Sequence, residues 1–121
     1  MTPSQFRSLA LSIPEVMEGS HMDHADFRIH GKVFATLGYP DESFGMVKLS
    51  PREQRSLIKK SPAAFAPIAG AWGKSGATKV NLAKARSAEV HDALEIAHEY
   101  LLAKLKARTA TNHAPGNARR A

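Results

Sequence analysis

The chain has 121 residues, 43% of them hydrophobic and 23% charged, a composition typical of one globular domain with a single core. It contains no cysteine, which excludes a disulfide framework and a thiolate metal cage, and it has no apolar run near the ~18 residues that span a bilayer. The formal net charge of +6 is uneven, because residues 48–86 carry nine basic side chains and only Glu53 as an acid. The N-terminus also lacks the features of a signal peptide, so we expect a cytoplasmic protein. We also expect it to be a monomer.

The first predicted element is a helix that begins near Pro3. Residues 2–5 (TPSQ) combine a capping threonine, a proline suited to the first turn and a glutamine that can bond back to the cap. Apolar residues then recur at helical spacing from Phe6 to Ile13. Pro14 should end the helix, because the residue before a proline is pushed out of the helical region.

From residue 18 to residue 49 the apolar period changes to two, which predicts an antiparallel meander. Alternation over 26–37 with Gly31 in its middle predicts a hairpin whose turn has two or three residues. The register of this hairpin stays open, because a two-residue turn pairs two phenylalanines but places Lys32 opposite an isoleucine. Residues 45–49 should form the next strand.

The sequence of the second half of the chain predicts a helix, a short turn, a loop and then a strand. Residues 50–53 (SPRE) repeat the cap, proline and acid pattern, so a second helix should run to about Lys60 with one edge buried. A short turn is expected around Phe65 and a loop over 70–76. Alternation over 78–82 then predicts a strand.

A final helix should run from a capping Ser87 to about Ala107, with apolar residues on one arc and acidic residues on the opposite arc. The residues after it lack apolar periodicity. We therefore predict one α+β domain over 1–107, built as an antiparallel meander sheet with helices packed on one face, and a disordered basic tail over 108–121.

Five segments of the chain, in this order and spacing, resemble the bacterial MmcQ/YjbR family: Ser20-His21-Met22, Asp26-Phe27-Arg28-Ile29, Gly31-Lys32-Val33-Phe34-Ala35, Met46-Val47-Lys48-Leu49 and Gly70-Ala71-Trp72-Gly73. The resemblance extends over about residues 3–105. It implies a compact α+β fold similar to the bacterial frataxin homologues (CyaY-like), in a family described as DNA-binding. Frataxins bind iron on an acidic first helix, whereas the helix expected here from Pro3 to Ser12 contains no acid, so the iron function does not carry over.

The basic middle segment is the main candidate site. Arg52, Arg55 and Lys59 are spaced so that they share one face of the second helix, where cations can hold phosphates. We expect Trp72 to pack in the core, since a lone tryptophan in a small domain usually does. The alternative is an indole exposed beside Lys74, which could stack a base or a ligand.

Two other patterns favour structural roles. Residues 70–75 (GAWGKS) have only two residues between the glycines and precede a strand, so they predict a tight turn and not a phosphate-binding loop. His21 and His24 lie where a strand passes into a turn, which favours a polar turn over a metal site.

We therefore predict a non-enzymatic binding domain without cofactor or metal, which binds DNA weakly and with little sequence preference. The alternative is a small-ligand or protein-interaction domain, in which the turn around His21 and the loop at Trp72 line a cleft. No nucleophile or carboxylate pair can be placed in one pocket, so no catalytic residue is predicted. The predicted nucleic-acid-binding residues are Arg52, Arg55, Lys59, Lys60, Trp72, Lys74 and Lys79.

Overall fold

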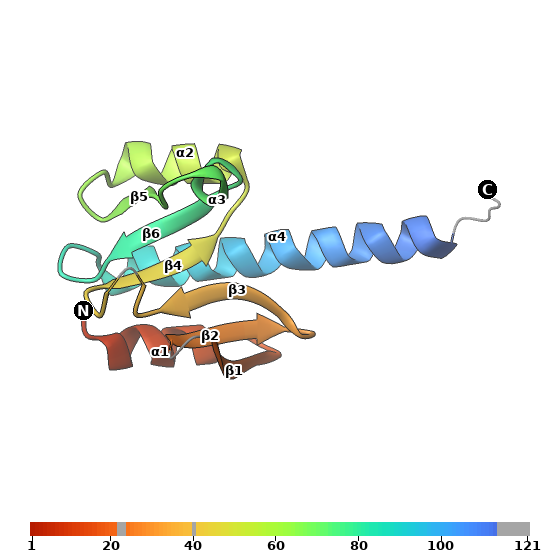
Figure 1. Cartoon of the computed structure of the whole chain (residues 1–121), viewed down its shortest axis with the longest axis horizontal. Coiled ribbons are helices and arrows are strands. Elements are labelled where there is room, and N and C mark those ends of the chain that lie inside the picture. Colours follow the sequence, from red (N-terminus) through yellow and green to blue (C-terminus); the bar gives the residue numbers. More distant parts are fainter. Residues whose placement is uncertain (22–23, 40, 114–121) are drawn as a thin grey trace.

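The structure is a computed structural model that describes residues 1–21, 24–39 and 41–113. Six strands form one antiparallel sheet in the order β1-β2-β3-β4-β6-β5, and α1 and α4 pack on one face of it (Figure 1). The predicted α+β class with an antiparallel meander and helices on one face is confirmed. The elements are α1 (Pro3–Leu11), β1 (Val16–His21), β2 (His24–Ile29), β3 (Lys32–Leu37), β4 (Phe44–Lys48), α2 (Pro51–Lys60), β5 (Phe65–Pro67), α3 (Ala71–Lys74), β6 (Ala77–Asn81) and α4 (Ser87–His113).

The main core lies between the sheet and the pair α1 and α4. Phe6 of α1 and Leu94 of α4 are fully buried there, together with Phe27 and Val47 of the sheet. Neighbouring residues of a strand point to opposite faces, so Met46 and Lys48 lie on the face that α1 and α4 leave uncovered. We call this second face of the sheet the open face.

Local hydrogen bonds set the start of both predicted capped helices. The Thr2 hydroxyl accepts from the Gln5 amide at 3.1 Å, and the Gln5 side chain accepts from the Thr2 amide at 2.8 Å. The Ser50 hydroxyl accepts from the Glu53 amide at 3.1 Å, so α2 begins as predicted. These caps satisfy backbone donors that a helix cannot pair internally.

The structure resolves the register of the β2–β3 hairpin. Its turn has two residues, both with positive φ, and Lys32 stands opposite Ile29. A β-bulge then shifts the pairing by one residue, so that Phe27 faces Ala35 and not Phe34. Both Phe34 and Ala35 are therefore buried on the same side, against α4 and the core.

Two short elements differ from the sequence prediction. Phe65–Pro67, expected as part of a turn, forms the edge strand β5 and pairs with β6. Ala71–Lys74, expected as a loop, forms the single-turn helix α3. Neither segment is long enough for its periodicity to be recognised in the sequence.

The last helix is longer than predicted. It continues to His113, so residues 108–113 of the expected disordered tail are helical, because no proline or glycine interrupts the chain before Pro115. In Figure 1 the C-terminal part of α4, drawn in blue, projects well beyond the sheet. None of the helices in the described part of the chain is long and apolar enough to cross a membrane.

Candidate nucleic-acid interface

The outer side of α2 carries three exposed cations in a row. The helix turns Gln54, Leu57 and Ile58 towards the protein, which leaves Arg52, Arg55 and Lys59 facing water, as their spacing predicted. No ion pair among the described residues engages any of these three. We call Arg52, Arg55 and Lys59 the α2 strip.

Lys60 does not belong to this strip. It lines an open groove of about 540 Å³ between α2 and α4, together with four acidic residues of α4. These acids are Glu89, Asp92, Glu95 and Glu99. The positive charge of Lys60 is therefore offset by its surroundings, in contrast to the charges of the α2 strip.

Trp72 is 43% exposed, so the expectation that it packs in the core is wrong. The reason lies in α3, where Gly73 takes the buried position and turns both of its neighbours, Trp72 and Lys74, towards water. The ammonium of Lys48 lies over the Trp72 ring, 5.5 Å from its centroid. The indole is thus an accessible surface beside a cation.

Lys48 is partly buried, and the charge of a second cation, from α4, acts on it. Burial, together with the positive charge of Lys104, lowers the pKa of the Lys48 ammonium below its ordinary value of 10.5. Lys104 itself lies over the ring of Tyr100, 5.1 Å from the centroid. We call these four residues the cation–aromatic cluster: Trp72, Lys48, Lys104 and Tyr100.

Sequence reasoning missed this cluster. It placed Lys104 and Tyr100 on the final helix and gave neither residue a role in binding. A usable signal was present, because Tyr100 and Lys104 are four residues apart on a predicted helix and must share a face.

Lys79 extends the cationic surface across the open face of the sheet. It pairs in register with Met46, while Lys48 pairs with Ala77, so Lys48 and Lys79 are diagonal neighbours. Such diagonal residues are about 7–8 Å apart. The Lys79 ammonium lies 4.9 Å from the centroid of the Phe44 ring, and no ion pair of the described residues engages it.

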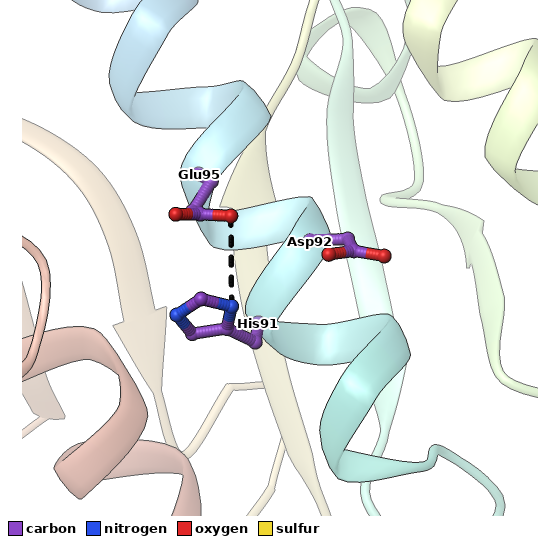
Figure 2. Close-up of side chains that lie close together, drawn as sticks. All are labelled: His91, Asp92 and Glu95. Carbon is purple, nitrogen blue, oxygen red and sulfur yellow. Dashed lines mark ion pairs between the residues drawn. The ribbon is translucent and has the colours of Figure 1, made fainter.

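Three potential metal-ligating side chains lie elsewhere on α4. The donor atoms of His91, Asp92 and Glu95 are within 4.8 Å of one another. His91 Nδ1 and Glu95 Oε1 are 3.6 Å apart, and Figure 2 shows Asp92 projecting from another side of the helix, away from this pair. Exposed residues at i and i+4 on a helix commonly pair in this way, so an ion pair accounts for the arrangement.

His24 lines a groove of about 530 Å³ with Pro3, Leu37 and Glu42, and Trp72 is not among the residues that line this groove. The side chain of His21, the other half of the predicted polar turn, and residues 22–23 lie outside the part of the chain that is described.

Comparison with known proteins places the chain in a family. Residues 11–100 match the family model named YjbR. The chain belongs to the YjbR family. The resemblance to MmcQ/YjbR proteins inferred from the five sequence segments is confirmed, and the matched region of this YjbR protein includes the α2 strip and all of the cation–aromatic cluster except Lys104.

A solved structure supports the fold of this YjbR protein. The crystal structure of Deinococcus radiodurans protein DR2400, which contains a DUF419 domain, superposes with a TM-score of 0.66 at 17% sequence identity, covering 80% of this chain and 75% of that chain. At this identity the similarity concerns the fold alone. No curated protein matches the sequence.

Lys48 should lower the stability of the folded protein at neutral pH. Because its pKa is lowered on folding, the native state binds this proton less tightly than the unfolded chain does, so stability rises with pH as Lys48 loses its charge. An uncharged side chain of similar length removes this cost. We expect Lys48→Met to raise the free energy of unfolding at pH 7 by up to about 1 kcal/mol, since a partly exposed charge is screened.

Urea denaturation at pH 7 measures this effect. The matched control is Lys84→Met, at an exposed lysine after β6, where a change within about 0.5 kcal/mol is expected. A loss of more than about 0.5 kcal/mol in Lys48→Met, relative to this control, contradicts the prediction.

Proposed function

We propose that this YjbR protein binds nucleic acid through phosphate contacts from the α2 strip, continued by Lys74 on α3 and by Lys48 and Lys79 on the open face. Arginine and lysine contacts to phosphates supply affinity and orientation without reading the base sequence. The protein should therefore bind DNA of any base sequence, and its affinity should fall steeply as the salt concentration rises.

One observation supports the proposal above the others. The α2 strip consists of three exposed cations that no carboxylate of the described residues neutralises, while the acids of α4 gather in the groove on another side of α2. A local excess of one charge sign raises the concentration of a polyanion at that surface. Total charge does not have this effect when both signs are mixed.

The test is a titration of labelled 20-nucleotide single-stranded DNA and of the matching duplex, followed by fluorescence anisotropy at low and moderate salt. The double variant Arg55→Glu/Lys59→Glu should weaken binding at low salt at least tenfold, because it replaces two cations of the strip with anions that repel phosphate. The plot of log affinity against log salt should also become shallower, by about 0.9 for each duplex phosphate that the variant no longer neutralises.

Two controls separate this surface from general attraction to positive charge. Lys32→Glu/Lys84→Glu makes the same change of net charge at exposed lysines outside the strip and should alter affinity less than threefold. Arg119→Gln/Arg120→Gln tests the two C-terminal arginines in the full chain. Absence of binding at low salt, or equal losses in the strip variant and the Lys32/Lys84 control, would contradict the proposed function.

A further inference from the structure

Resting on the proposed function, we infer that the cation–aromatic cluster binds single-stranded nucleic acid, with backbone phosphates held by Lys48 and by Lys104 and bases stacked on Trp72 and Tyr100. The residues of the cluster come from three separate elements: the end of β4, α3 and α4. The inference names the form of nucleic acid and the point on the surface where its bases are held.

The two lysines form a pair of like charges. Among the described residues no carboxylate forms an ion pair with either ammonium, and each lies over an aromatic ring instead. Burial and the positive charge of Lys104 both disfavour the charged form of Lys48, so a bound anion would stabilise that form. A backbone phosphate at Lys48 would supply this anion.

An aromatic ring lies beside each of the two lysines. Lys48 lies over the Trp72 ring, and Lys104 lies over the Tyr100 ring. A lysine stem is flexible, so each ammonium can move from its ring to a phosphate oxygen and leave the ring face free for a base. Alternating aromatic and cationic groups are the usual surface for single strands.

Bases in a duplex cannot reach these rings. They are stacked on one another inside the helix, whereas an unpaired base presents its flat face to any aromatic side chain. Phosphate contacts alone would serve duplex and single strand alike. The rings therefore decide between the two forms, and they should favour the single strand.

Trp72 provides a direct signal, because it is the single tryptophan of the chain. We use three ligands of equal length: dT12, an abasic 12-unit phosphate backbone, and a 12-base-pair duplex. We expect dT12 to quench the Trp72 fluorescence and to bind at least fivefold more tightly than the abasic backbone. The duplex should bind without quenching.

Variants then assign the two parts of the cluster. Trp72→Ala should weaken dT12 binding between about 5-fold and about 100-fold, the range expected for loss of one stacked base, and weaken abasic binding less than twofold. Trp72→Leu keeps an apolar side chain on α3 and should give the same result if the alanine variant is poorly folded. Lys48→Gln/Lys104→Gln should weaken dT12 and abasic binding by the same factor.

The aromatic control is Tyr39→Ala. Tyr39 is 44% exposed, close to the value of Trp72, and lies in the loop before β4, whereas Lys48 ends that strand. Its replacement should change dT12 affinity less than twofold. The affinity of this variant for dT12 is measured by anisotropy, which does not depend on a change in Trp72 fluorescence.

The outcomes distinguish this inference from the function on which it rests. Equal affinity for dT12 and the abasic backbone, or unchanged Trp72 fluorescence on saturation, overturns the inference while Arg55→Glu/Lys59→Glu can still show that nucleic acid is bound. Absence of binding to all three ligands at low salt overturns both.

Discussion

Replacement of Gly76 by alanine is expected to lower the free energy of unfolding by at least about 3 kcal/mol, a large part of the stability of an ordinary domain. A Cβ at this position would lie 1.8 Å from the Leu49 carbonyl oxygen, and the residue has a φ of +114°. The carbonyl that blocks it belongs to the backbone and cannot rotate away, so the chain itself must move. The Leu49 amide donates a backbone hydrogen bond of 3.1 Å to the Gly76 carbonyl, and that movement would break it.

Gly70→Ala separates the two causes of this loss. Gly70 also has a positive φ, +83°, but a Cβ there meets nothing within 4 Å. Its replacement should cost only about 1–3 kcal/mol, the strain of an L residue in a conformation with positive φ and a ψ of −161°, which is essentially restricted to glycine. Urea denaturation measured by circular dichroism gives both values, and similar losses for the two variants would show that the close approach at Leu49 has no energetic role.

Gln54→Glu is the second change expected to have a large effect, at least about 3 kcal/mol at pH 7. The buried Gln54 side chain donates from Nε2 to the carbonyls of Gly73 and Ala77, both at 3.0 Å, and so ties α2 to α3 and β6. An ionised glutamate would place its negative charge against these two carbonyl oxygens without a proton to donate. Gln54→Leu, which only removes the two hydrogen bonds, should cost about 1–3 kcal/mol.

The glutamate variant should also depend on pH in a defined direction. Burial against two acceptors raises the pKa of the new carboxyl on folding, so the native state binds its proton more tightly than the unfolded chain does. Stability should therefore be regained as the pH falls and lost as it rises through the raised pKa. Denaturation curves at pH 5 and pH 7 test this, and a loss independent of pH would contradict it.

The control for this substitution is Gln5→Glu. Gln5 is exposed and accepts from the Thr2 amide in the cap of α1, a role that glutamate also fills. We expect a change within about 0.5 kcal/mol at either pH.

Features that depend on neighbouring residues in the sequence were predictable. The starts of α1 and α2 follow from caps that act within three residues, and both were predicted correctly. The common face of Arg52, Arg55 and Lys59 follows from the helical repeat in the same way. Whether this face contacts nucleic acid remains a prediction.

Features that depend on the core were not predictable. The register of the β2–β3 hairpin is set by a bulge that buries Phe34 and Ala35 together, and only the packing against α4 requires it. The exposure of Trp72 likewise depends on Gly73, whose position beside the Ile68 carbonyl leaves no room for a side chain. The composition favoured a buried tryptophan, but Gly73 is the buried residue of α3 and Trp72 is exposed.

The cation–aromatic cluster illustrates the same limit for a functional surface. Lys48 and Lys104 are far apart in the sequence, and the charge of Lys104 acts on Lys48 only because the fold packs α4 against β4. The prediction of a helix ending near Ala107 was close enough to include Lys104. It could not indicate which strand the end of that helix would pass.

The charges along α4 have a consequence for how salt acts on this protein. Its acids lie in the first half of the helix, from Glu89 to Glu99, and the described cations after them are Lys104, Lys106 and Arg108. A charge interacts with the helix macrodipole mainly within the first or last turn, and of these residues only Glu89 lies there. Salt should therefore leave the end of α4 helical, and a salt-dependent loss of binding at Lys104 would report the screening of its charge.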